Sequence, residues 1–113
     1  MSTREIEARA ISRRAEAVLA ALRAHEPELR ACGIEGLSLF GSLARGDDDS
    51  HSDVDIAVRV GTVTGSGFAY FARLQDLQER LGRILDSSVD MVTEPVRNPK
   101  LQRALEAERI VAF

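Results

Sequence analysis

The sequence at positions 53–60 reads DVDIAVRV and alternates between apolar residues and polar or small ones. Its valine and isoleucine residues fall on one face of an extended chain, because successive side chains of a strand point to opposite sides. This pattern predicts a β-strand with one buried face. Asp53 and Asp55 share the other face, with roughly 6 to 7 Å between them from strand geometry.

A second short strand is predicted just upstream, where residues 36–40 read GLSLF. Leu37 and Leu39 share one face of this strand. The polar stretch from Gly41 to Ser52, with two glycines and several ionisable residues, predicts a turn and loop between the two strands.

Helical spacing of apolar residues predicts the elements that flank these strands. An amphipathic helix is expected at about 2–29, capped by Ser2 or Thr3, and Pro27 either ends it or opens a short extra turn. A helix of about 15 residues is expected from Phe68 onward. Its stripe of Phe68, Phe71, Leu74 and Leu77 is interpreted mainly as core, and partner binding by part of it stays open.

The C-terminal part predicts one more strand and one more helix. Residues 88–93 read SVDMVT and form a short strand candidate closed by Glu94 and Pro95. A helix at about 98–109 begins near Asn98, which can cap it, with Pro99 at the first helical position. Residues 110–113 either extend that helix or form a short terminal strand.

This order of elements predicts an α/β (α+β) fold, a small mixed sheet of three or more strands packed by helices. We expect a single domain over residues 1–113, with a core at about 30–95, because 113 residues with 44% hydrophobic content support one core.

Composition narrows the classes of partner. The net charge of −3 gives no overall attraction to nucleic acid or anionic membrane, and aromatic residues make up only 4% of the chain. No apolar run approaches the roughly 18 residues that a membrane span needs. Cys32 is the only cysteine, and the first thirty residues lack the apolar core of a signal peptide. We therefore expect a cytoplasmic protein with no membrane contact and no direct nucleic-acid ligand.

Three carboxylates form the candidate catalytic centre. Asp53 and Asp55 would repel each other if unpaired, and Asp90 supplies a third oxygen donor if its strand lies beside theirs. Divalent cations remove such repulsion, and Mg²⁺ prefers carboxylate oxygens together with water and substrate phosphate. The pattern indicates a Mg²⁺ site for phosphoryl chemistry.

A phosphate grip is predicted at the start of the loop. Gly41 lets the backbone approach a ligand closely, and the Ser42 hydroxyl and nearby N–H groups suit phosphate oxygens. Arg45 has two interpretations, as a further phosphate contact or as an ordinary surface ion pair with an acid at 47–49. His25, His51 and Cys32 lack companions at ligand spacing, which disfavours zinc and thiol chemistry.

The order Gly41-Ser42, ten intervening residues, and Asp53-Val54-Asp55 resembles the GSx10DxD signature of the DNA polymerase β nucleotidyltransferase superfamily. The stretches LFGSLARG at 39–46 and SDVDIAV at 52–58 are similar, in particular, to minimal nucleotidyltransferase (MNT) domain proteins of bacteria and archaea. The similarity spans about residues 30–95, and the tail at 101–111 is similar more loosely.

The resemblance implies a polymerase-β-like fold, with Asp53, Asp55 and Asp90 as metal ligands and Asp90 also assisting as general base. It implies phosphate contacts at Gly41 and Ser42. Many relatives are antitoxins that transfer AMP from ATP to a tyrosine of a helical HEPN-type RNase toxin. The expected ligands are thus Mg²⁺, ATP and a cognate HEPN toxin.

The sequence departs from the family pattern at two places, and two alternative functions stay open. Leu43 stands where an aromatic is common in the family, and the loop at 47–51 is unusually acidic. One alternative is an antitoxin that neutralises its toxin by binding alone. The other is transfer to a small molecule or to RNA, and the negative net charge argues against RNA.

Overall fold

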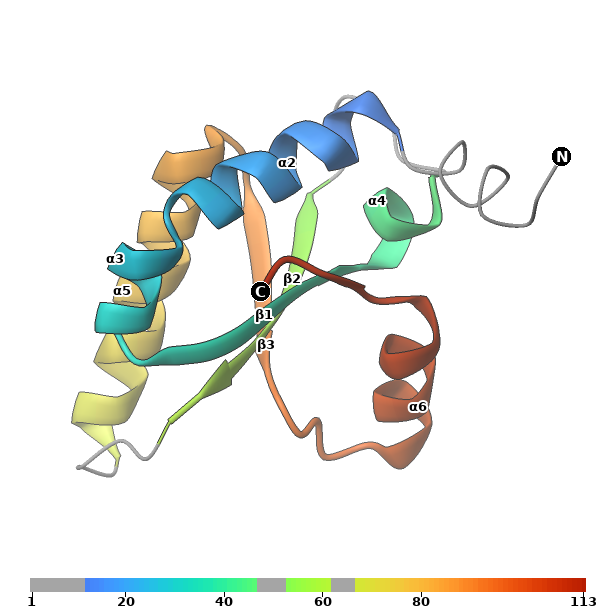
Figure 1. The fold of residues 1–113 in the computed structure, drawn as a ribbon. Coiled ribbons are helices and arrows are strands. Elements are labelled where there is room, and N and C mark those ends of the chain that lie inside the picture. Colours follow the sequence, from blue (N-terminus) through green and yellow to red (C-terminus); the bar gives the residue numbers. More distant parts are fainter. Residues whose placement is uncertain (1–11, 47–52, 62–66) are drawn as a thin grey trace, which may run out of the picture.

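The structure is a computed structural model of the 113-residue chain, and it describes residues 12–46, 53–61 and 67–113 (Figure 1). The described elements follow one another along the chain as α2 Arg13–Ala24, α3 Glu26–Ala31, β1 Ile34–Phe40, α4 Gly41–Arg45, β2 Val54–Val60, α5 Phe68–Leu85, β3 Val89–Thr93, α6 Pro99–Glu108 and β4 Ile110–Val111.

The strands form one mixed, four-stranded sheet in the order β3-β2-β1-β4. Strand β1 runs antiparallel to both β2 and β4, whereas β2 and β3 are parallel. The predicted small mixed sheet covered by helices is therefore confirmed. The parallel β2–β3 pair brings two acid-bearing strands side by side.

The core lies on one face of the sheet. Val54, Ile56 and Val58 of β2 are each 0% exposed. Helix α2 contributes Ala15 and Leu22 to the same cluster, and α5 contributes residues further along the chain, Leu77 and Leu81 among them. Figure 1 shows α2, α3 and α5 gathered on one side of the strands and α6 on the other.

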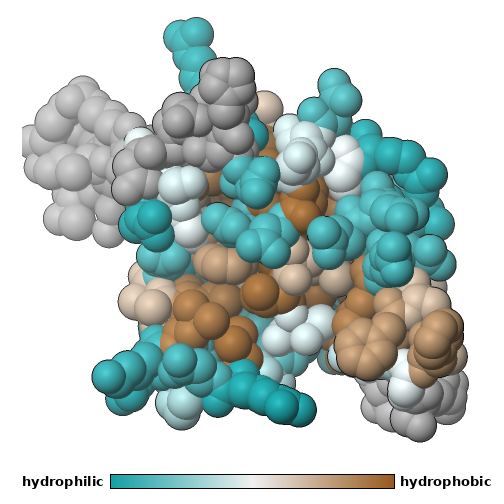
Figure 2. Space-filling model, turned by 180° about the vertical axis from the view of Figure 1, so that it is seen from behind, coloured by the Kyte–Doolittle hydropathy of each residue, from teal (hydrophilic) through white to brown (hydrophobic). Residues whose placement is uncertain are grey.

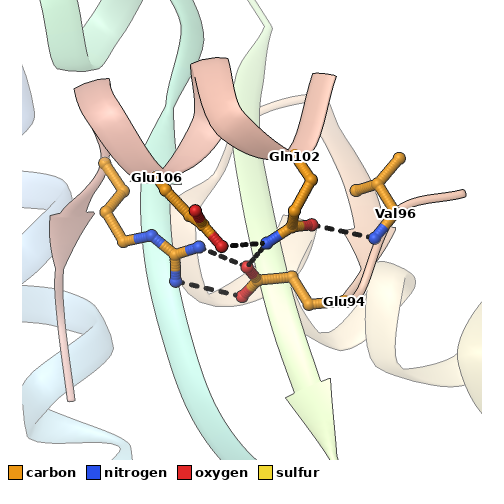
Figure 3. Close-up of polar contacts among 5 residues, drawn as sticks. Glu94, Val96, Gln102 and Glu106 are labelled. Atoms are coloured by element: carbon orange, nitrogen blue, oxygen red, sulfur yellow. Dashed lines mark hydrogen bonds and ion pairs between the residues drawn. The ribbon is translucent and has the colours of Figure 1, made fainter. Parts of the chain in front are cut away.

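A polar network holds α6 against the end of β3 (Figure 3). Glu94, just after β3, accepts hydrogen bonds from Arg109 and from Gln102, the latter at 3.0 Å. The Gln102 side chain also accepts from the Val96 N–H at 2.9 Å and donates to Glu106. Burial alone would raise the pKa of Glu94, but the hydrogen bonds from Arg109 and Gln102 outweigh it and hold that pKa below its ordinary value.

The prediction of one continuous helix at 2–29 is wrong within the described residues. Ser12 has an extended backbone, and its side chain accepts a hydrogen bond from the Ala15 N–H at 3.0 Å, so α2 begins at Arg13. Helix α2 ends at Ala24 with His25 as its C-cap, and α3 follows with Pro27 in its first turn, which is the short extra turn that the sequence left open. The suggested caps Ser2 and Thr3 lie outside the described residues.

The predicted loop after β1 begins instead with the short helix α4. Leu43 is fully buried, which ties this turn of chain to the core and favours a compact helical conformation over an open loop. The rest of the predicted loop, residues 47–52, lies outside the described part of the chain.

Helix α5 is longer than predicted, with 18 residues, and its first turns are not core. Phe68 and Phe71 are 93% and 70% exposed, so their assignment to the core was wrong. Tyr70 and Leu74 are partly buried, and Leu77 and Leu81 are buried, because only the later turns of α5 cover the sheet. Figure 2 shows hydrophobic residues, coloured brown, exposed on the surface of the molecule.

The C-terminal elements agree with one of the two predicted outcomes. Asn98 caps α6 by accepting from the Lys100 N–H at 3.0 Å, with Pro99 in the first turn, as predicted. The last residues form strand β4 rather than a longer helix, and Arg23 of α2 donates to the carbonyls of Val111 and Ala112 at 2.9 Å. None of the described helices combines the length and apolar character that a membrane crossing requires.

Candidate active site

The three predicted acids lie on one face of the sheet. Asp55 of β2 and Asp90 of β3 are register partners in the parallel pair, so their side chains leave the sheet on the same side. Asp53 immediately precedes β2, two residues before Asp55, and is exposed. The structure therefore places Asp90 beside Asp55 on the neighbouring strand, although Asp90 lies 37 positions after Asp53 in the sequence.

We call the surface that carries Asp53, Asp55 and Asp90 the acid face, and its charges act on one another at Asp55. The pKa of Asp55 is raised above its ordinary value, first by burial and then by the negative charges of Asp90 and Asp53. The Arg45 guanidinium opposes this rise, and Glu108 adds to it. Such mutual repulsion among carboxylates is relieved when a cation binds between them.

The residues present fit Mg²⁺ held jointly with a substrate better than a cage built by protein alone. Within the described ranges, no three His, Cys, Asp or Glu side chains are already arranged as a metal cluster. Mg²⁺ commonly takes only one or two carboxylates and completes its shell with water and substrate phosphates. The acids on adjacent strands match that donor chemistry.

The glycine–serine turn faces these acids. Phe40, the last residue of β1, is the register partner of Asp55, so the chain enters the turn beside that carboxylate. Gly41 has a φ of +73°, and a Cβ placed on it would collide with the Asp55 carboxylate. The backbone of Gly41 can therefore approach Asp55 only because it carries no side chain.

Ser42 and Arg45 follow on α4. Ser42 is partly buried at the second position of this helix, and Arg45 is its last residue. An Arg45 Nη1 lies 3.3 Å from a carboxylate oxygen of Glu108. The interpretation of Arg45 as the partner of an acid at 47–49 concerns residues outside the described part of the chain.

Glu108 is a residue of this site that the sequence did not single out. The Gly41 N–H donates to its Oε1 at 2.9 Å, although the two residues are 67 positions apart. The only signal in the sequence is the looser similarity of the tail at 101–111 to the family. His25 instead contacts the Ala21 carbonyl at the end of α2, and Cys32 is a free, partly buried thiol.

Comparison with known families identifies the family of this chain. The family model described as "Polymerase beta, Nucleotidyltransferase" matches residues 28–112. The chain belongs to this nucleotidyltransferase family. The match contains β1, the turn, both acid-bearing strands and α6, which are the elements that build the site.

Two curated relatives of the nucleotidyltransferase come from Methanocaldococcus jannaschii. The protein named "Putative protein adenylyltransferase MJ1379" is 32% identical over 91 residues, which cover 79% of this chain and 88% of the relative. A second, "Putative protein adenylyltransferase MJ0126", is 28% identical over the same shares of both chains.

Solved structures share the fold. One described as "Structure of putative minimal nucleotidyltransferase" has a TM-score of 0.60 at 26% identity and covers 97% of this chain and 95% of its own. A toxin–antitoxin structure with AMP-PNP has a TM-score of 0.63 at 23% identity and covers 80% of this chain and 72% of its own. A tri-AMPylated Shewanella oneidensis HEPN toxin in complex with its MNT antitoxin has a TM-score of 0.57 at 20% identity, with coverage of 84% and 71%.

These findings confirm the predicted family, fold and enzyme class. The chain is a polymerase-β-like minimal nucleotidyltransferase, an enzyme that transfers nucleotidyl groups. The roles of individual residues rest on the geometry described above.

Proposed function

We propose that this nucleotidyltransferase transfers AMP from ATP to a tyrosine hydroxyl of a cognate HEPN-type RNase toxin and so acts as an antitoxin in the cytoplasm. The observation that carries the proposal is the approach of the Gly41 turn to Asp55, which is itself in register with Asp90. The residues proposed to bind phosphate and metal thereby lie on one face. Residues 1–113 are proposed to act as one domain.

The acids have distinct proposed roles. Asp53, Asp55 and Asp90 would hold Mg²⁺, and their shared repulsion at Asp55 favours a divalent cation at this face. When bound, Mg²⁺ would neutralise charge on the phosphates and on the leaving pyrophosphate. Asp90 stands on the edge strand of the sheet, where an incoming acceptor can reach it.

The turn would hold the triphosphate beside these acids. Gly41 admits the phosphates close to the backbone, and Ser42 offers both a hydroxyl and an N–H group. Arg45 adds positive charge on the same short helix. Phosphoryl-type transfer depends mainly on positioning and charge stabilisation, so these groups contain the parts that the reaction needs.

The reaction proceeds in one displacement. The acceptor hydroxyl oxygen forms a bond to the α-phosphorus of ATP while the bond between that phosphorus and the bridging oxygen of pyrophosphate breaks. Asp90 takes the hydroxyl proton as general base. The products are the AMP ester of the acceptor and pyrophosphate.

The choice of acceptor and nucleotide rests on the relatives. The archaeal relatives are named as protein adenylyltransferases, and the Shewanella complex contains an AMPylated HEPN toxin with its MNT antitoxin. AMP-PNP, an ATP analogue, is present in another toxin–antitoxin neighbour. Together they favour ATP as donor and a protein hydroxyl as acceptor.

The test is incubation with the protein encoded by the adjacent gene, ATP and Mg²⁺, followed by intact-mass measurement of that protein. We expect the mass to rise by whole AMP groups, and peptide mapping to place them on tyrosine. The double variant Asp53→Asn/Asp55→Asn should give no gain, while Asp76→Asn on the exposed surface of α5 should behave as wild type. An unmodified partner with the wild-type enzyme would contradict the proposal.

Neutralisation by binding alone is a second candidate, favoured by the exposure of Phe68 and Phe71 at the start of α5. It predicts that the folded Asp53→Asn/Asp55→Asn variant still protects cells that express the toxin. Loss of protection by that variant excludes it. Transfer of labelled AMP to a panel of small molecules and RNA, with no labelled protein, would favour the other acceptor classes instead.

A further inference from the structure

Glu108, the last residue of α6, contacts two groups that the proposed function assigns to phosphate binding. Its Oε1 accepts the Gly41 N–H at 2.9 Å, and its Oε2 lies 3.3 Å from Arg45 Nη1. One carboxylate from the C-terminal end of the chain therefore touches both ends of the short helix α4. The Glu108 side chain is mostly buried, with 26% of its surface exposed.

The backbone around Glu108 is held in place. Its neighbour Arg109 pairs with Glu94 at the end of β3, and Gln102 reaches the same carboxylate (Figure 3). The Arg109 N–H also bonds the Leu105 carbonyl at 2.9 Å. The contact with the turn is thus anchored to β3, the strand that carries Asp90.

Gly41 lies between two carboxylates. Its Cα faces Asp55 so closely that a side chain there would collide, and its N–H is bonded to Glu108. A hydrogen bond from a backbone N–H to an ionised acceptor is among the stronger ones in proteins. Together the two contacts fix the orientation of the peptide group that opens the turn.

We propose that Glu108 is a positioning residue for nucleotide binding. Its carboxylate holds the Gly41 N–H and restrains Arg45, so that the turn is already ordered when the triphosphate reaches it. Preorganisation of this kind raises affinity by removing the cost of ordering the site on binding. The inference rests on the proposed function, since it assumes that the site binds ATP.

A Glu108 that competes with phosphate would respond differently to substitution. If the Glu108 carboxylate occupied positions that phosphate needs, every substitution that removes its charge would tighten nucleotide binding. If Glu108 positions the turn, the acceptor oxygen matters more than the charge. Glu108→Gln keeps an oxygen that can accept the Gly41 N–H, whereas Glu108→Ala removes it.

The experiment measures AMP-PNP affinity in Mg²⁺ by calorimetry for wild type, Glu108→Ala and Glu108→Gln. Loss of a charge-assisted hydrogen bond predicts about tenfold weaker binding or more for Glu108→Ala, and a change within about threefold for Glu108→Gln. Tighter or unchanged binding by Glu108→Ala overturns the proposal. Glu106→Ala on the same helix is the matched control, because Glu106 contacts Gln102 and not the turn. An equal loss in that control would also overturn it.

Amide hydrogen exchange at Gly41 reports the contact without nucleotide. We expect exchange to be about tenfold faster or more in Glu108→Ala and close to wild type in Glu108→Gln and Glu106→Ala. Unchanged exchange in Glu108→Ala contradicts the contact. A wild-type chain that binds no AMP-PNP contradicts the proposed function, whereas a wild type that binds while Glu108→Ala loses nothing contradicts only the role of Glu108.

Discussion

The two faces of strand β2 differ in their surroundings and in the side chains they carry. Val54, Ile56 and Val58 are fully buried against the helices, whereas Asp53 and Asp55 stand on a negative, partly open face. Burial of apolar surface stabilises the folded state, while clustered like charges oppose it. One strand thus supplies the core with one face and the proposed chemistry with the other. Substitutions on the two faces should therefore have opposite effects on stability and activity.

The largest expected effect is on transfer by the Asp53→Asn/Asp55→Asn variant. Removing two of the three proposed metal ligands should lower the rate of AMP transfer by about a thousandfold or more, equivalent to roughly 4 kcal/mol of transition-state stabilisation. The melting temperature without metal should stay equal or rise, because the raised pKa of Asp55 shows that its charge is unfavourable in the folded state. Labelled-AMP transfer and thermal melting measure the two quantities. A large fall in melting temperature would mean that these acids are structural.

Substitutions on the buried face of β2 should lower the stability of the fold. Ile56→Ala removes a fully buried side chain and should lower the free energy of unfolding by about 3 kcal/mol. Urea denaturation measures this value, and Asp55→Asn, one position earlier on the same strand, is the matched control that should show no such loss. A cost below about 1 kcal/mol would contradict the separation of the two faces, since core truncations normally cost more.

Gly41→Ala tests where the acid face meets the turn. An alanine at a φ of +73° is strained by about 1–3 kcal/mol, and its Cβ would also collide with the Asp55 carboxylate. Gly67→Ala is the control, because Gly67 has a similar φ of +70° but open space around a Cβ. We expect Gly41→Ala to lose AMP transfer beyond its loss of stability, and Gly67→Ala to retain transfer when folded. Equal activity in the two folded variants would remove the special role of the Gly41–Asp55 approach.

The smallest effect concerns the network that holds α6 beside the acid face. The pKa of Glu94 is lowered in the folded state, so its contribution to stability is complete above the ordinary glutamate pKa of 4.5 and is lost as the pH falls through the lower folded value. Chemical denaturation at a series of pH values from neutral to acid measures the free energy of unfolding. This free energy should fall less steeply with decreasing pH for Glu94→Gln than for wild type. Identical slopes would mean that Glu94 does not draw stability from Arg109 and Gln102.

Much of this arrangement could be predicted from the sequence because it depends on local rules. The period-two pattern of residues 53–60 fixes which side chains share a face, so the common face of Asp53 and Asp55 follows from strand geometry alone. Asp90 required one further assumption, that its strand is the neighbour of β2, and the parallel register bears this out. The turn after β1 was predictable from its glycine and serine, although its helical form was not.

The parts that were missed depend on tertiary contacts. Glu108 reaches Gly41 only because β4 and the Glu94 network fold the C-terminal segment back onto the sheet, and no local pattern encodes that return. Helical periodicity placed Phe68 and Phe71 on the same stripe as Leu77, but it cannot say how far along α5 the covered sheet extends.

Crystallography with Mn²⁺ and AMP-PNP tests the central claim most directly, because the anomalous scattering of Mn²⁺ locates the metal independently of any assay. The account predicts a Mn²⁺ peak between the carboxylates of Asp53 and Asp55, with the triphosphate running from that metal to the Gly41–Ser42 turn. A metal or nucleotide bound elsewhere, such as in the hollow of about 660 Å³ that Phe71 and Met91 line between α5 and β3, would contradict it.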